Sequence, residues 1–205
     1  MRSRVLRILK RTALLLAAVA ITLMAVRVYD TQRGPPLEVW HTYAPPELGA
    51  DELDQADWSR YLAAEAAVFD AVRAEVDEEL DAGDRVPVNR YFDGSPVHPG
   101  GLAQDWNRSY VLEPDGAPIG AAVFLHGLTD SPYSLRHIAR RYRAHGYVSI
   151  AIRLPAHGTV PGALAEVEWE DWMAATRLAV REARRCARPR VVDRAAYRRR
   201  GPPSA

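Results

Sequence analysis

The segment 121–158 constrains the fold of this chain more than any other part of the sequence. An apolar run over 121–125 is followed by a short polar turn and by a stretch whose apolar residues recur at helical spacing. A second apolar run then occupies 147–152. Buried strands that alternate with a helix in this order are typical of an α/β fold, in which right-handed crossovers join parallel strands. We therefore expect a mostly parallel sheet flanked by helices.

Three strands are expected. Residues 108–114 and 119–125 predict two strands joined by a turn at Asp115-Gly116. The second of these strands is nearly all apolar, as a strand covered on both faces should be. The third strand covers 147–154.

Two helices accompany these strands. The first has Ser131 as a candidate N-cap, Pro132 at its first helical position and Gly146 at its end. The second covers about 167–185, and its uncovered side is expected to add exposed apolar surface. The apolar side of the second helix comprises Trp169, Trp172, Met173, Thr176, Val180 and Ala183.

A further amphipathic helix is predicted over 58–81, with Asp57 as its cap and Gly83 as a left-handed residue at its end. Its predicted outer face is acidic and comprises Glu65, Asp70, Glu75, Asp77 and Glu78. Binding of a cation or a partner is one interpretation of that face, and a solvated face is the interpretation we favour.

Three short motifs follow the apolar runs. His126-Gly127-Leu128-Thr129 and Asp130-Ser131-Pro132 come after the first run, and Ala156-His157-Gly158-Thr159 comes after the second. Together with the intervening helix, they resemble the N-terminal portion of the α/β-hydrolase superfamily, in its esterase, lipase and serine aminopeptidase branch. The resemblance covers roughly 108–188. It is looser over 89–107, where NRYF and QDWN look like the lead-in of membrane-anchored bacterial relatives.

The resemblance implies a partial active site. It assigns His126, Gly127, Leu128 and Thr129 to an oxyanion-hole loop, in which the Leu128 N–H points into the hole and His126 shapes the loop without acting as the base. Preorganised N–H groups of this kind stabilise the negative charge that develops on a carbonyl oxygen during acyl transfer. His157 and Gly158 are a possible substrate-side loop, although a structural turn is the interpretation we favour.

The catalytic residues of such an enzyme are missing from this chain. The nucleophile of the fold lies in a G-x-S-x-G turn that is followed by an acid and then a histidine, and no G-x-S-x-G occurs in the 205 residues. Ser131 and Ser134 lie where a hydroxyl would cap a helix rather than attack a substrate. We therefore expect a chain truncated before its nucleophile and inactive alone, with no catalytic residue of its own.

The C-terminal end of the chain departs from the pattern of the rest. Residues 190–192 begin what could be another buried strand, and 193–205 form an irregular tail rich in Arg and Pro. Lys10 is the only lysine among the 27 Lys and Arg residues, which suggests a GC-rich gene. An out-of-frame stretch of such a gene yields Arg, Ala, Pro and Gly, so we hypothesise a frameshift or truncation near Val192. The strand 147–154 would then be an open sheet edge capable of self-association.

A basic segment followed by an apolar run over 13–26 indicates a membrane anchor or a signal peptide at the N-terminus. We favour the anchor, because no small-residue cleavage site follows the run. The positive-inside rule then predicts a single span in the bacterial inner (cytoplasmic) membrane, with the body on the extracytoplasmic side. The expected organisation is 1–29 basic segment and transmembrane helix, 30–56 Pro-rich linker, 57–83 amphipathic helix, 84–192 N-terminal half of the hydrolase domain, and 193–205 tail.

Composition narrows the possible partners. The net charge is +1, but acidic residues outnumber arginine between residues 30 and 180, which argues against nucleic acid as a partner. Six histidines lack metal-type spacing, and no nucleotide-binding glycine loop is present, so no metal or cofactor is expected. The expected function is that of a membrane-anchored serine hydrolase-like protein acting on a small acyl substrate, an ester, thioester or amide. The alternative is a non-catalytic anchored module that binds a partner through the acidic helix and the Pro-rich segment.

Overall fold

The computed structural model describes residues 2–34 and 36–187. The predicted strand 190–192, the tail 193–205 and the expected break near Val192 lie outside the described residues. The chain divides into two compact units, 1–37 and 38–205, which are described separately.

The first unit contains a single helix, α1 (Arg2–Gln32). Its segment Leu6–Gln32 contains an 18-residue stretch with a mean hydropathy of 2.0, and its 27 residues make it long and apolar enough to cross a membrane. At a rise of 1.5 Å per residue this segment is about 40 Å long, which exceeds the hydrocarbon thickness of a bilayer. A signal sequence near an N-terminus meets the same criterion.

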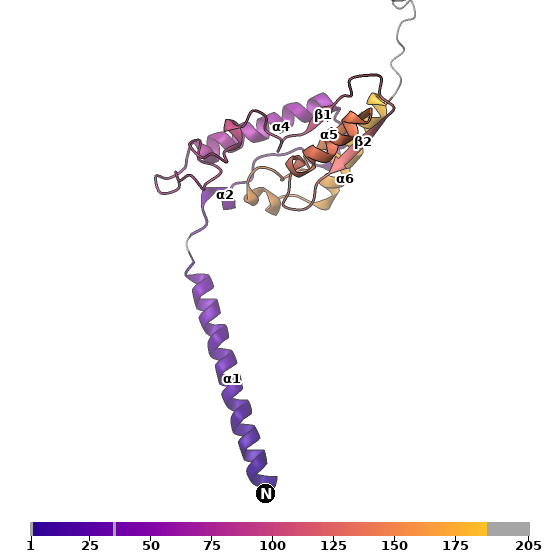
Figure 1. The fold of residues 1–205 in the computed structure, drawn as a ribbon. Helices are drawn as coiled ribbons and strands as arrows, with labels where there is room; N and C mark the ends of the chain where they lie inside the picture. The colour runs from indigo at the N-terminus through magenta and orange to yellow at the C-terminus, as the bar shows by residue number, and fades with distance from the viewer. Residues whose placement is uncertain (1, 35, 188–205) are drawn as a thin grey trace, which may run out of the picture. The chain divides into compact units, whose positions relative to one another are not determined.

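Over residues 38–187 the second unit is a mixed α/β structure built on a three-stranded sheet (Figure 1). Its strands are β1 (Tyr110–Leu112), β2 (Gly120–Leu125) and β3 (Tyr147–Ile152), in the spatial order β1-β3-β2. The pair β2 and β3 is parallel, and β1 and β3 are antiparallel. The three predicted strands are therefore confirmed, but the first two do not pair with each other, because the helical crossover after β2 places β3 between them.

This order corrects the predicted open edge. The strand expected at 147–154 has a neighbour on both sides, and within 36–187 the strands whose outer sides have no partner are β1 and β2. Self-association through an open sheet edge stays a prediction, although the edge is not the strand 147–154.

Helices cover both faces of β3. Val148, Ile150 and Ile152 belong to a core cluster with α6 (Trp169–Cys186) and α3 (Ala50–Gln55). Ala151 packs on the other face with Tyr110 and with Ala139 of α5 (Arg136–Ala144). Successive residues of a strand point to opposite faces, so β3 is buried from both directions and forms the centre of the domain.

The apolar residues of α6 divide between two sides of the helix. Its buried side consists largely of small residues, which permit close packing on the sheet: Ala174, Ala175, Leu178, Ala179, Glu182 and Ala183. Trp169, Met173 and Val180 are exposed. The exposed apolar surface that was expected on this helix is therefore present in the described part of the chain.

The long predicted helix is shorter than expected. It forms α4 (Trp58–Val72), continues as a single π-helical turn η1 (Arg73–Asp77), and then ends. Asp57 caps it as predicted, since its Oδ1 accepts a hydrogen bond of 2.8 Å from the Arg60 N–H. Gly83 is not left-handed; the glycines with positive φ in the described ranges are Gly146, which ends α5 as predicted, and Gly158.

The predicted acidic face of this helix is only partly exposed. Glu65 is buried, and Asp77 is half-buried with its Oδ2 3.1 Å from His98 Nε2. Glu65 differs from the prediction because its carboxylate faces a buried arginine rather than solvent.

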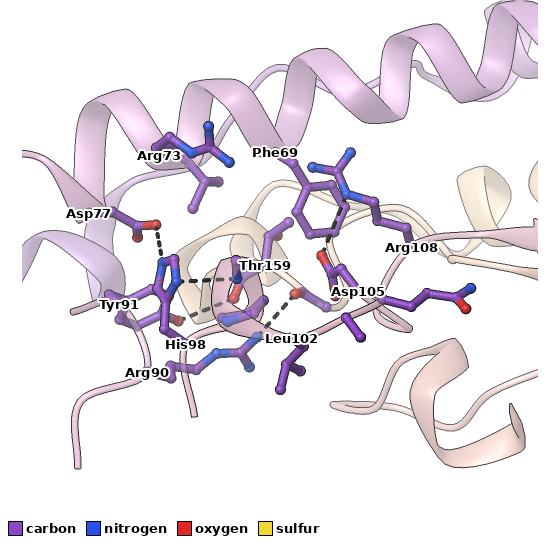
Figure 2. A pocket seen from close by; sticks show the side chains of 16 residues that line it. Phe69, Arg73, Asp77, Arg90, Tyr91, His98, Leu102, Asp105, Arg108 and Thr159 are labelled. Atoms are coloured by element: carbon purple, nitrogen blue, oxygen red, sulfur yellow. Dashed lines mark hydrogen bonds and ion pairs between the residues drawn. The ribbon is translucent and has the colours of Figure 1, made fainter. Parts of the chain in front are cut away.

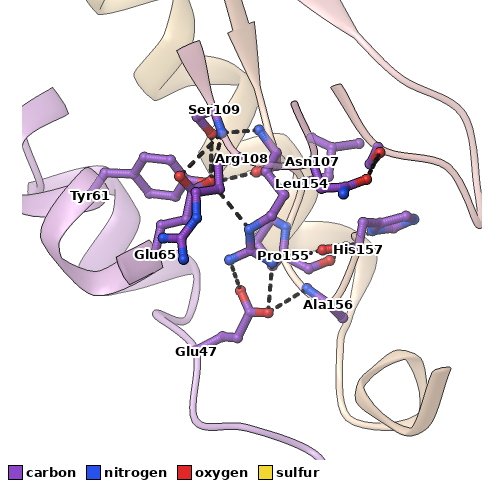
Figure 3. A network of polar contacts seen from close by, with 12 residues as sticks. Glu47, Tyr61, Glu65, Asn107, Arg108, Ser109, Leu154, Pro155, Ala156 and His157 are labelled. Carbon is purple, nitrogen blue, oxygen red and sulfur yellow. Dashed lines mark hydrogen bonds and ion pairs between the residues drawn. The ribbon is translucent and has the colours of Figure 1, made fainter. Parts of the chain in front are cut away.

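That arginine, Arg153, joins three segments that are distant in sequence (Figure 3). Its side chain is 1% exposed, and its two terminal nitrogens donate to Glu47 Oε1 and Oε2 at 2.9 and 2.8 Å. Its Nε donates to Glu65 Oε1 at 3.3 Å. Burial by itself lowers the pKa of a guanidinium, but the neighbouring Tyr61 and the two carboxylates raise the pKa of Arg153 above its ordinary value, so it stays charged.

Backbone groups complete this Arg153 network. Ser109 Oγ donates to Glu65 Oε1 at 2.7 Å and accepts from the Arg153 N–H at 2.7 Å. The Ala156 N–H donates to Glu47 Oε1 at 2.8 Å. The Pro-rich segment around Glu47, helix α4 and the chain leaving β3 are therefore held together by bonds to charged groups.

We predict that Arg153→Met lowers the free energy of unfolding by about 3–5 kcal/mol, because it leaves the buried Glu65 carboxylate without a counter-ion. The measurement is urea unfolding of the full chain in detergent micelles, followed by tryptophan fluorescence. The matched control is Arg177→Met, which breaks an exposed bidentate pair with Asp54 and is expected to leave the midpoint nearly unchanged. Equal shifts for the two variants would contradict the prediction.

Candidate functional site

Two loops meet at the carboxyl ends of the parallel strands. The register pairs Leu125 of β2 with Ile152 of β3, so the chain leaves both strands at the same end of the sheet. In open α/β sheets, ligands bind outside the carboxyl ends of the strands. A cavity of about 410 Å³ lies there, and it is lined by Arg90, Tyr91, Asn107, Thr129, Asp130, Ser131, Ala156, His157, Gly158, Thr159, Val160, Pro161 and Leu164.

His126, the first residue of the loop after β2, holds this loop in place through both of its ring nitrogens. It is buried, its Nδ1 lies 3.0 Å from the Gly127 carbonyl oxygen, and its Nε2 accepts the Leu154 N–H at 3.0 Å. Because a carbonyl oxygen only accepts, Nδ1 carries the proton and the ring is neutral. Burial, the largest cause, lowers the pKa of His126 below its ordinary value. Both ring nitrogens are occupied, so this histidine ties one loop to the other.

The next three residues leave the sheet, and the last of them, Thr129, has a strained backbone. A Cβ added to Gly127 would meet no atom within 4 Å, so the fold itself does not require glycine there. Leu128 is exposed. Thr129 has φ 61°, which is rare for a β-branched residue and is the kind of strain that concentrates at functional sites.

The serines of this loop are engaged in hydrogen bonds. Ser131 occupies the N-cap position of the short 3₁₀ turn η3 (Pro132–Leu135) as predicted, but its hydroxyl does not cap. It donates instead to Asn107 Oδ1 at 2.8 Å, and Ser134 Oγ donates to Asp130 Oδ2 at 2.6 Å. Neither hydroxyl has a histidine partner in the described structure, so neither is arranged as an activated nucleophile.

The second loop is equally constrained. Ala156 and Gly158 have φ 66° and 74°, and a Cβ at Gly158 would lie 3.2 Å from the Asn107 carbonyl oxygen. His157 is buried, its Nδ1 lies 2.8 Å from the Pro155 carbonyl oxygen, and its ring centroid is 4.9 Å from that of His126. His157 Nε2 and Thr159 Oγ1 are buried without a hydrogen-bond partner within the described residues.

The structure therefore brings together part of the predicted site. Thr129, His157 and Gly158 line one cavity, and His126 contacts His157 beneath it. Gly127 and Leu128 are not part of the lining. The role of the Leu128 N–H as an oxyanion-hole donor stays a prediction.

Sequence reasoning did not single out three further lining residues, Arg90, Tyr91 and Asn107. They come from the NRYF and QDWN motifs, whose resemblance to anchored relatives was the available signal. Tyr91 Oη donates to the Thr159 carbonyl oxygen at 3.1 Å, and Arg90 Nη2 donates to the Gly158 carbonyl oxygen at 3.4 Å. No group of three His, Cys, Asp or Glu side chains in the described ranges could hold a metal ion.

Comparison with known proteins gives partial similarities to lipolytic enzymes. No protein-family model matches the chain. It is 33% identical over 60 residues to a thermostable monoacylglycerol lipase of Bacillus sp. (strain H-257), a match that covers 29% of this chain and 24% of the lipase. A solved structure reported for LipS and LipT, two metagenome-derived lipolytic enzymes, shares 28% identity and a TM-score of 0.36 over 39% of this chain and 31% of that chain.

The chain thus spans about a quarter of the lipase and 31% of the solved lipolytic chain. The sequence match supports an α/β-hydrolase-like relationship for this part of the protein. This coarse relationship agrees with the mixed α/β sheet.

We predict that His126 makes folding sensitive to acid. The unfolded chain takes up a proton on this histidine below about pH 6.5, whereas burial keeps the folded ring neutral to a lower pH. Between those two values the unfolded state binds more protons, so stability falls as the pH falls. Melting temperatures between about pH 7 and pH 5 should fall less in His126→Gln than in the wild type. The control His137→Gln, at an exposed position, should keep the wild-type dependence; equal acid sensitivity in all three proteins would refute the assignment.

Proposed function

We propose that this chain supplies the carbonyl-oxygen-binding part of a serine hydrolase-like site that acts on an ester, thioester or amide. The observation that carries the proposal is the loop 126–129 at the carboxyl end of β2, in which the strained residue Thr129 lines a cavity together with the loop after β3. The cavity lies within the range of roughly 300–1,000 Å³ that holds small molecules.

The chemistry expected of this loop is electrostatic. A backbone N–H held in a fixed loop can stabilise an oxyanion without reorganising during the reaction, and loss of one such donor costs about 10²–10³ in rate. The His126 ring supports this role by fixing the loop through its bond to the Leu154 N–H. A nucleophile, a base and an orienting acid are also required, and these 205 residues hold no G-x-S-x-G turn to provide the first.

The substrate class follows from the partial sequence match. The matched relative is a monoacylglycerol lipase, so a monoacylglycerol ester is the substrate we propose for the completed site. We further propose that α1 anchors the protein in a bacterial inner membrane with the second unit on the extracytoplasmic side. The apolar segment Leu6–Gln32 and the basic residues near the N-terminus support this location.

The alternative, a non-catalytic anchored module, depended on the acidic helix and the Pro-rich segment. Two of the five acidic residues assigned to the helix face, Glu65 and Asp77, are engaged inside the protein. Glu47 of the Pro-rich segment is bound to Arg153. Both features are thus used in folding, which favours the hydrolase-like proposal.

Binding of glycerol monobutyrate, a soluble monoacylglycerol, tests the proposed loop. We expect this ester to shift the backbone amide signals of Leu128 and Thr129 in two-dimensional NMR spectra. Gly127→Val fills the open space beside the loop and should remove these shifts, since no protein atom lies within 4 Å of its Cβ position. Gly116→Val is the matched control, because its Cβ position is also open, and it should bind as the wild type does. Unchanged binding by Gly127→Val would refute the proposed site.

A second test concerns the missing nucleophile. We expect the purified 205-residue chain to hydrolyse p-nitrophenyl butyrate no faster than buffer and to resist labelling by a fluorophosphonate probe. The reason is that the Ser131 hydroxyl is bound to an amide oxygen, which cannot accept its proton as a base. Stoichiometric labelling of any serine, Ser131 included, would show that the assignment is wrong.

A further inference from the structure

A second cavity, of about 250 Å³, lies between the end of α4 and the segment 90–108 (Figure 2). Arg73, Arg90 and Arg108 line it, and the carboxylates in its lining belong to Asp77 and Asp105. Three guanidinium groups therefore face two carboxylates around one small space. Such an excess of positive charge in a partly enclosed site favours an anionic ligand.

The histidine in this pocket does not add to the positive charge. His98 Nδ1 accepts the Gly100 N–H at 3.2 Å, so that nitrogen carries no proton. Its Nε2 is then the protonated nitrogen and donates to Asp77 Oδ2 at 3.1 Å. The ring is neutral in this arrangement, and the local excess corresponds to a single charge.

Contacts with neighbouring groups position Arg90 and Arg108, and all three arginines keep N–H donors that no described residue uses. Arg108 has its guanidinium carbon 4.1 Å from the centroid of the Phe69 ring and its Nε 3.5 Å from Asp105 Oδ2. Arg90 Nη2 donates to the Gly158 carbonyl oxygen at 3.4 Å. Arg73 is exposed, and its side chain has no hydrogen-bond or ion-pair partner among the described residues. A guanidinium carries five N–H donors, so most of those in the pocket are available to a ligand.

The rest of the wall is apolar or aromatic. Phe69, Val72, Tyr91 and Leu102 line the cavity beside the arginines. The volume lies just below the range of roughly 300–1,000 Å³ that accommodates drug-sized ligands, which indicates a small molecule. A single excess charge suits a monoanion better than a phosphate dianion.

We propose that this pocket binds a small organic monocarboxylate. Guanidinium groups hold the carboxylate through charge-assisted, bidentate hydrogen bonds, for which the planar fork of arginine is suited. The apolar part of the ligand lies against Phe69 and Tyr91. This binding does not depend on the proposed hydrolysis, because none of the loop residues 126–129 lines the pocket.

Calorimetric titration of the full chain in detergent micelles with benzoate tests the proposal, with protein-free micelles as the blank. Saturable binding of benzoate is expected, with weaker binding of acetate, which lacks the ring, and none of benzamide, which lacks the charge. Absence of saturation up to about 10 mM benzoate, or equal binding of benzamide, overturns the proposal.

Two substitutions locate the binding. Arg73→Gln removes one guanidinium at an exposed position and is expected to weaken benzoate binding about tenfold, with an unchanged circular-dichroism melt. Arg184→Gln removes the same charge from the exposed side of α6, outside the pocket, and is expected to leave binding unchanged. Equal weakening by the two variants overturns the proposal, because it would show a response to net charge alone.

Discussion

The buried ion pairs of Arg153 are the interaction on which the rest of the second unit depends. A guanidinium with 1% exposure is tolerated only where its donors are satisfied, and here Glu47, Glu65 and the His157 carbonyl oxygen satisfy them. The same carboxylates accept backbone N–H groups of Ser109 and Ala156. Charge pairing and backbone satisfaction are thus combined in one place, directly after the central strand.

This network also positions the candidate site. Arg153 is the first residue after β3, and Ala156, whose N–H it indirectly fixes through Glu47, has a left-handed backbone. On the opposite loop Thr129 is also left-handed, and His126 accepts a hydrogen bond from the Leu154 N–H. Strain of this kind persists only where surrounding bonds over-determine the backbone, and the two loops supply these bonds to each other.

The two cavities share one wall. Arg90, Tyr91, Gly158 and Thr159 line both, and the hydrogen bonds of Arg90 and Tyr91 to the 158–159 backbone fix that wall from both sides.

Local sequence patterns by themselves determined the α/β class, the three strands, the Asp57 cap and the end of a helix at Gly146, because each depends on neighbours within a few residues. The loop 126–129 was singled out by the resemblance to α/β-hydrolases. Only the tertiary structure decided that β3 lies between β1 and β2, and that Glu65 faces inward. The partners of Arg153 lie 106 and 88 residues away in sequence, a separation that no local periodicity encodes. Burial of a charge is decided by whichever distant groups reach it, so the fold had to be known before its role could be assigned.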